Sequence, residues 1–311
     1  EPGETQTSWT RSYSACAARQ AVEKSFCPQT ITRRVRNGCD RICLGKIQVK
    51  ENPQPNPLRS VLGHGIIAFL VTTAAAWIPP LSFSGFQTDQ TFSRIWLFIS
   101  DSGAHWGIGF AMLLATALVA TKHTGLKIRT LKAIQFLAGL FAVLLAFALI
   151  NEFVTKPAAG KHRPFVIKLE KEGLLIGDEL YGQGNKPERT QFLEKLFAEN
   201  ANHPLIQSVH PLVRRHWEVH TGFSFPSGHS QNAFLFAMIL GYLIGELVTN
   251  GKRWMWIPFV WAGAICLSRV ALGVHSPLDV TIGALTGGLI GGLILKLGLL
   301  NKLIKKEAPQ A

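Results

Sequence analysis

Six apolar segments constrain this chain more than any other feature of its sequence. Each is close to the roughly 20 residues that an α-helix needs to cross the hydrocarbon core of a bilayer. A soluble domain accommodates one or two such helices in its core, so six of them predict an all-α, polytopic membrane protein built as a six-transmembrane-helix bundle. The segments are 61–80, 104–121, 133–151, 232–249, 254–273 and 280–300.

The composition agrees with a membrane protein. Apolar residues make up 47% of the chain and charged residues 16%, against about 25% charged in typical soluble domains. The net charge of +13 also fits a nucleic-acid-binding protein, but blocks of basic residues interleaved with aromatic residues are missing from the sequence. We therefore expect a membrane partner and no nucleic acid.

Basic residues are concentrated in alternate connections. They follow the second, fourth and sixth segments, whereas the 81–103 loop has one arginine and two aspartates and the long 152–229 connection is nearly neutral. The positive-inside rule then predicts that both termini are cytoplasmic and that residues 152–229 lie outside. The basic residues in question are Lys122, Lys127, Arg129, Lys252, Arg253, Lys302, Lys305 and Lys306.

The segmentation predicts three parts. Residues 1–59 form a polar, basic cytoplasmic segment that ends in the linker ENPQPNP, residues 60–300 form the membrane domain, and residues 301–311 form a basic cytoplasmic tail. No apolar stretch typical of a cleavable signal peptide occurs in residues 1–50. Four cysteines of the first part lack the close pairing of a zinc site, so we expect free thiols there. They are Cys16, Cys27, Cys39 and Cys43.

Several residues are expected to pack against neighbouring helices. Residues 189–199 read as an amphipathic helix, and we expect residues 165–222 to form a small helical cap on the outer side that either only packs or gates lipid entry. Gly283, Gly287 and Gly291 recur at four-residue spacing and predict close approach of a neighbouring helix. One face of the 189–199 helix holds Phe192, Leu193, Leu196 and Phe197, and we expect Cys266 to be a core residue. Four residues shortly before position 226 either tune lipid choice or only pack, with packing favoured: His216, Trp217, Glu218 and His220.

Polar residues gather at the outer ends of three segments. The third segment leads to Lys156 and Arg163, the fourth is preceded by Pro226-Ser227-Gly228-His229, and the fifth leads to Arg269, His275 and Asp279. Taken singly, the first pair fits side chains that snorkel to the interface, and Arg269 with Asp279 fits a structural ion pair. Because a bundle brings all three ends together, their combination predicts a functional site.

These residue types suit phosphoryl chemistry. Arginine and lysine bind phosphate oxygens, and N–H groups of the Ser227-Gly228 turn before a helix form an anion-binding concavity. A carboxylate four residues after His275 can fix the ring's tautomer, so that the imidazole attacks phosphorus while a second histidine protonates the leaving oxygen. No acidic or histidine cluster resembles a metal site, and we expect neither metal nor cofactor, with basic residues stabilising the transition state.

The spacing identifies a resemblance. Lys156-x6-Arg163-Pro164, Pro226-Ser227-Gly228-His229 and Ser268-Arg269-x5-His275-x3-Asp279 resemble the three-part signature of the type 2 phosphatidic acid phosphatase (PAP2) superfamily. The resemblance covers roughly residues 60–300, and the stretches RPFVIKLEKEG and RRHWEVHTGFSFPSGH are similar to its bacterial phosphatidylglycerophosphatase branch. It implies that His275 is the nucleophile, Asp279 its orienting partner and His229 the acid and then the base. It also implies a phosphate-binding set of Lys156, Arg163, Ser227, Gly228 and Arg269.

The resemblance further implies metal-independent dephosphorylation of membrane lipid phosphates through a phosphohistidine, at the periplasmic face of a bacterial inner membrane. The substrates it implies are phosphatidylglycerophosphate, phosphatidic acid, lysophosphatidic acid and undecaprenyl diphosphate, and the spacing does not choose among them. Transfer of the phosphoryl group to another lipid is an alternative with the same intermediate. A lipid or ion transporter is disfavoured because its charges would lie near mid-membrane, and a haloperoxidase-like protein is disfavoured by the six spans.

Overall fold

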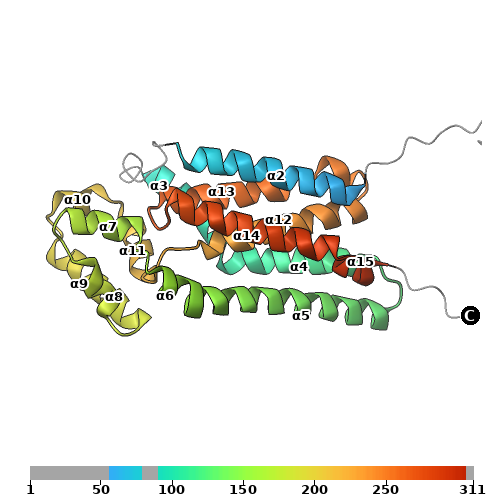
Figure 1. The fold of residues 1–311 in the computed structure, drawn as a ribbon, viewed down its shortest axis with the longest axis horizontal. Helices are drawn as coiled ribbons and strands as arrows, with labels where there is room; N and C mark the ends of the chain where they lie inside the picture. Colours follow the sequence, from blue (N-terminus) through green and yellow to red (C-terminus); the bar gives the residue numbers. More distant parts are fainter. Residues whose placement is uncertain (1–55, 79–89, 306–311) are drawn as a thin grey trace, which may run out of the picture. The chain divides into compact units, whose positions relative to one another are not determined.

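The computed structural model describes residues 56–78 and 90–305, and this part of the chain is helical and free of strands. The all-α prediction is therefore confirmed for these ranges, whereas the cysteines predicted to be free thiols before residue 55 lie outside the described residues. Labels follow Figure 1. The helices are α2 (Pro57–Ala76), α3 (Gln90–Ser102), α4 (His105–Thr121), α5 (Leu126–Ile150), η2 (Asn151–Thr155), α6 (Lys156–Ala159), α7 (Pro164–Lys171), α8 (Gly177–Gly182), α9 (Lys186–Glu199), α10 (Pro204–Ser208), α11 (Pro211–Val219), α12 (Gly228–Leu247), η3 (Gly251–Arg253), α13 (Ile257–Ala271), α14 (Pro277–Lys296) and α15 (Leu299–Ile304).

Five described helical stretches are long and apolar enough to cross a membrane, and a sixth is reached if the pair α3 and α4, bent by 44°, counts as one span. The five are Pro57–Ala76, Leu126–Lys171, Gly228–Leu247, Gly251–Ala271 and Pro277–Lys296. The prediction of a loop over 81–103 is wrong for Gln90–Ser102, because these residues form helix α3. Serines and Asp101 interrupt its apolar residues, so α3 lacks the continuous run by which the other segments were found.

Helix α12 lies at the centre of the long helices. It packs against α2, α4, α13 and α14, and its residues 233–243 are buried on all faces. The predicted glycine face of α14 makes the closest of these approaches: a Cβ added at Gly287 would lie 1.9 Å from the carbonyl oxygen of Gln231, and one at Gly283 would lie 2.4 Å from that of Ser227. The absence of side chains therefore lets the N-terminal turns of α12 and α14 meet.

Helices α7 to α11 form a second hydrophobic cluster at one end of the long helices (Figure 1). Trp217 of α11 is fully buried in it, stacks on Phe165 with ring centroids 4.9 Å apart, and donates a hydrogen bond to the carbonyl of Leu272 at 2.8 Å. In α9, Leu193 and Phe197 are buried in this cluster, and Phe192 and Leu196 pack against it. The predicted amphipathic face is thus confirmed, as is the burial of Cys266 in the other cluster.

Candidate active site

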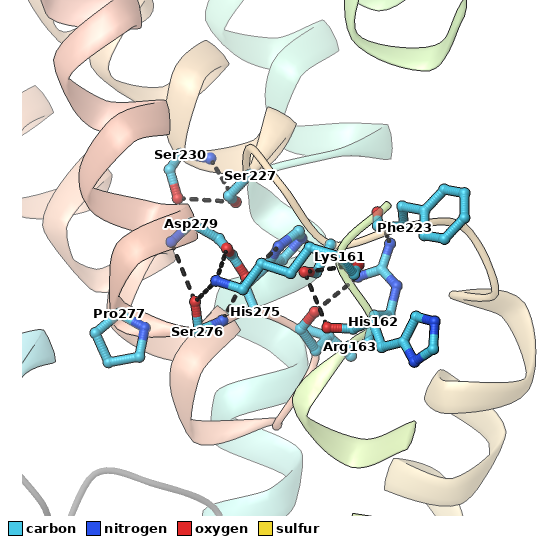
Figure 2. Close-up of polar contacts among 12 residues, drawn as sticks. Lys161, His162, Arg163, Phe223, Ser227, Ser230, His275, Ser276, Pro277 and Asp279 are labelled. Carbon is cyan, nitrogen blue, oxygen red and sulfur yellow. Dashed lines mark hydrogen bonds and ion pairs between the residues drawn. The ribbon is translucent and has the colours of Figure 1, made fainter. Parts of the chain in front are cut away.

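The three parts of the predicted signature meet in space. Arg163 Nη1 lies 3.4 Å from His275 Nε2, the Ser227 N–H donates to the Asp279 carbonyl at 3.0 Å, and His275 Nδ1 lies 3.8 Å from Asp279 Oδ2. Figure 2 shows these segments around one point, at the end of the long helices where α12 and α14 begin. Loops that are far apart in sequence therefore form a single cluster.

The turn between α13 and α14 places His275 and Asp279. Helix α13 is closed by Gly273 at a φ of 68°, a left-handed conformation that glycine adopts without steric cost. Helix α14 starts with a capping box, in which the Ser276 hydroxyl accepts from the Asp279 N–H and the Asp279 carboxylate accepts from the Ser276 N–H at 2.7 Å. With Pro277 at the first helical position, the sequence Ser-Pro-Leu-Asp thus fixes the carboxylate one turn from the histidine.

The contacts of His275 define its tautomer. Arginine can only donate, so the contact with Arg163 requires a lone pair on His275 Nε2, and the hydrogen of the neutral ring is then on Nδ1, facing Asp279. Burial, together with the positive charges of Arg163 and Arg269, lowers the pKa of His275 to about 3, although Asp279 opposes the shift. The ring is therefore neutral at pH 7 and carries a nucleophilic lone pair on Nε2.

The two predicted arginines are both buried but differ in their partners. Arg163 donates to the carbonyls of Gly222 and Val274 at 2.7 and 2.8 Å, and to Phe223 at 3.5 Å. Arg269 is fully buried, and its Nη1 donates to Ser100 and to His216 Nε2, the latter at 3.2 Å. Its Nε and Nη2 are without a hydrogen-bond partner among the described residues. Unpaired buried donors are costly, and a phosphoryl oxygen is an acceptor that would pair with them.

Three histidines follow one another beside Arg269. The His216 and His220 rings are 4.0 Å apart, and the His229 ring is 6.1 Å from that of His220. Burial and the positive charge of Arg269 lower the pKa of His216 to about 2 and that of His220 well below its usual value. Sequence reasoning treated His216 as a packing residue and missed that its neutral ring accepts from Arg269, for which no local pattern exists.

Two predicted phosphate ligands are already bonded. Lys156 Nζ forms an ion pair with Glu152, one helical turn earlier, at 2.6 Å. The Ser227 N–H is bonded to Asp279, and the Ser227 hydroxyl caps α12 by accepting from Ser230. The predicted anion-binding turn therefore has its open donors at Gly228 and His229, because the first N–H groups of a helix have no intrahelical acceptor.

Sequence reasoning also missed Lys161 and Ser100. Lys161 Nζ donates to Asp279 Oδ1 and to the Ser276 hydroxyl, each at 2.7 Å (Figure 2). Ser100 is fully buried on α3, the helix that the sequence assigned to a loop. Lys161 belongs to the six unspecified positions between Lys156 and Arg163. No signal in the sequence distinguishes it from a solvated lysine.

The sequence around this cluster is similar to that of known proteins. The sequence matches the PAP2 superfamily over residues 136–302. It is 35% identical over 151 residues to phosphatidylglycerophosphatase B of Escherichia coli (strain K12), which covers 47% of this chain and 55% of that protein. It is 37% identical over 88 residues to an undecaprenyl-diphosphatase of Sulfolobus acidocaldarius, covering 28% of this chain and 39% of that protein. It is also 41% identical over 73 residues to a lipid A 4'-phosphatase of Bacteroides thetaiotaomicron, covering 23% and 30%.

The predicted similarity to the phosphatidylglycerophosphatase branch is thus confirmed, with the chain spanning about half the length of the curated relatives it matches first. The matched range contains every predicted site residue from Lys156 to Asp279. Together with the five apolar helices, the matches to membrane-lipid phosphatases identify a multi-pass membrane protein.

Proposed function

The chain belongs to the PAP2 superfamily, and from this premise we propose that it dephosphorylates membrane lipid phosphates through a phosphohistidine intermediate, without a metal. The observation that carries the proposal is the environment of His275. Its Nδ1 side faces the Asp279 carboxylate, its Nε2 side faces Arg163, and two donors of the buried Arg269 have no hydrogen-bond partner in the described part of the chain. A neutral imidazole between an orienting carboxylate and phosphate-binding cations is suited to attack phosphorus.

The proposed reaction has two displacements. The lone pair of His275 Nε2 attacks phosphorus, the bond from phosphorus to the lipid oxygen breaks, and His229 gives that oxygen a proton. Water then attacks the phosphorus of the phosphohistidine, His229 takes its proton, and the P–N bond breaks to release inorganic phosphate. Asp279 stabilises the imidazolium that forms in the first step, as its position near Nδ1 allows.

The basic groups replace a metal in this scheme. Arg163 and Arg269 bind the non-bridging oxygens of the phosphoryl group, together with the N–H groups at the start of α12. Arg163 exchanges its long contact with His275 Nε2 for a phosphate oxygen, which exposes the lone pair when the substrate arrives. Lys156 contributes its charge when the ion pair with Glu152 opens or when the phosphate approaches that pair.

We further propose that six spans, counting α3 and α4 as one, place this site at the outer face of a bacterial inner membrane. The basic loops at the opposite helix ends support this orientation and cytoplasmic termini. Helices α7 to α11 are then a periplasmic cap on a PAP2-type domain of residues 60–300, between a basic cytoplasmic segment (1–59) and a basic tail (301–311). The acyl or isoprenyl chain of a substrate can remain in the bilayer while its phosphate reaches the site.

The substrate classes we propose are phosphatidylglycerophosphate, phosphatidic acid and undecaprenyl diphosphate. The first and last are supported by the names of two matched relatives. The test is phosphate release from each lipid by the purified protein in detergent, with and without EDTA. We expect EDTA to have no effect. His275→Asn should abolish release, since no other described side chain occupies the position of the nucleophile.

Labelling the lipid phosphate with ³²P tests for the phosphohistidine intermediate and distinguishes hydrolysis from phosphotransfer. Quenching a turnover with alkaline detergent should leave a label on the wild-type protein that is stable in alkali and lost in acid, and none on His275→Asn. Release of phosphate by the His275→Asn variant at the wild-type rate would overturn the phosphohistidine mechanism. Adding lipid A to undecaprenyl diphosphate and finding the label on the acceptor rather than in free phosphate would identify a phosphotransferase instead.

A further inference from the structure

Lys161 joins two parts of the site that the signature treats separately. It follows Gly160, which ends α6 at a φ of 54° and turns the chain toward α14. From this turn its ammonium reaches the capping box of α14 and bonds both Asp279 Oδ1 and the Ser276 hydroxyl at 2.7 Å (Figure 2). The chain separation between Lys161 and Asp279 is 118 residues, so this contact is a tertiary link.

This contact fixes one oxygen of the buried Asp279 carboxylate. Its side chain is fully buried, whereas that of Lys161 is 33% exposed. The Ser276 N–H bonds Oδ2 and Lys161 bonds Oδ1, while His275 Nδ1 is 3.8 Å away and has no hydrogen-bond partner among the described residues. A buried carboxylate that loses the cation bonded to it loses part of the compensation for its desolvation. Lys161 therefore holds the oxygen that His275 does not use.

We propose that Lys161 is a positioning residue that holds the Asp279 carboxylate in place beside His275 and limits how strongly Asp279 attracts the ring's proton. The proposal rests on the proposed function of His275 as the nucleophile. Lys161 is one of the unspecified positions in the first part of the signature, and its role in this chain follows from the ion pair with Asp279.

The charge of Lys161 acts on His275 through Asp279. With the ammonium present, Asp279 shares its negative charge between Lys161 and the ring, so the imidazolium is stabilised less than by a free carboxylate. Without it, the pKa of His275 should rise, and a larger fraction of the ring should be protonated and unable to attack at acidic pH. The charged and titratable groups that act on His275 from the elements around it are Arg163, Arg269, Asp279, Lys161, His216 and His229.

The test compares Lys161→Gln, Lys161→Arg and a matched control, Lys171→Gln, whose lysine is exposed on α7. We expect Lys161→Gln to lower kcat about 10- to 100-fold, the range seen for groups that orient a reactive ligand, with KM within about threefold because Lys161 is engaged by protein oxygens. The acidic limb of the kcat/KM profile should move to higher pH by about one unit, the shift that one partly buried charge produces. Lys161→Arg should restore most of kcat and return the limb, and Lys171→Gln should match the wild type.

Two results would overturn the proposal. One is a Lys161→Gln variant with the wild-type kcat and an unmoved acidic limb. The other is a rise of KM at constant kcat, which would make Lys161 a substrate ligand. A purely structural role would lower the thermal midpoint and the fraction of active protein without moving the limb, so the midpoint is measured for each variant, and Lys161→Arg remains informative if Lys161→Gln fails to fold. A wild-type protein without phosphatase activity would instead refute the proposed function.

Discussion

Arg163 and Arg269 approach the same histidine from two regions that are built differently. Arg163 lies in the turn before α7, where its guanidinium is bonded to the backbone carbonyls of Gly222, Phe223 and Val274. Arg269 lies in the last turn of α13, bonded through one nitrogen to Ser100 and His216, with its Nε and Nη2 unpaired among the described residues. Both arginines are buried, but Arg163 donates to the protein through Nε, Nη1 and Nη2. Arg269 donates through Nη1 alone among the described residues.

Because of this difference, the two arginines contribute differently to the stability of the fold and to phosphate binding. A guanidinium that ties three carbonyls from two loops stabilises the loops whether or not a substrate is present. A guanidinium with unpaired buried donors costs stability in the empty site and regains it when an anion supplies the acceptors. We therefore expect Arg163 to serve both the fold and the phosphate, and Arg269 to serve mainly the phosphate.

Among the tests of this comparison, the largest expected effect is at Arg269. Arg269→Lys keeps a positive charge but removes the unpaired Nε and Nη2 donors, so kcat/KM should fall about 10²- to 10³-fold, as for the loss of a transition-state donor. The thermal midpoint should be unchanged or higher, because the costly unpaired donors are gone. Activity and differential scanning fluorimetry in detergent measure both. Arg253→Lys, in an exposed position of η3, is the control, and a large fall in the midpoint of Arg269→Lys would contradict the assigned division.

A smaller change in activity and a larger one in stability are expected at Arg163. Arg163→Lys can bond at most part of the set of three carbonyls, which leaves a buried acceptor unpaired and should cost about 2–3 kcal/mol of unfolding free energy. Activity should fall as well, since the loops that hold His275 loosen. The comparison breaks down if Arg163→Lys is as stable as the wild type while Arg269→Lys is not.

Local patterns were sufficient for part of this site. The predicted ends of the apolar segments placed the three loops at the same end of the helix bundle. The four-residue spacing of His275 and Asp279 correctly placed the carboxylate beside the ring. Both inferences depend on helical geometry over a few residues, which sequence reveals directly. The same holds for the glycine face of α14 and the apolar face of α9.

Tertiary bonds were beyond the reach of the sequence. Lys161 and His216 are ordinary residues in their own segments, and only the fold shows that one pairs with Asp279 and the other with Arg269. Ser100 was hidden because α3 mixes serines with apolar residues and reads as a loop. The Ser227 N–H was expected to face an anion, and the close approach of α12 and α14 commits it to the Asp279 carbonyl instead.

The smallest expected effect concerns His216, the partner of Arg269. Its pKa is about 2 in the folded protein, through burial and the charge of Arg269, against about 6.5 in an unfolded chain. Above pH 6.5 neither state binds the proton and the stability is complete. As the pH falls below 6.5, only the unfolded chain takes up the proton, so the unfolding free energy decreases by up to about 1.4 kcal/mol per pH unit for this one group.

His216→Gln should remove that share, because the glutamine oxygen can accept from Arg269 but does not titrate. Thermal midpoints of the two proteins should therefore converge as the pH is lowered from 7.5 to 5, with the variant less sensitive to acid. Parallel curves would mean that His216 is protonated or exposed in the folded state. In that case Arg269 would lack its neutral acceptor, and the contrast between the two arginines would have to be assigned to Ser100 alone.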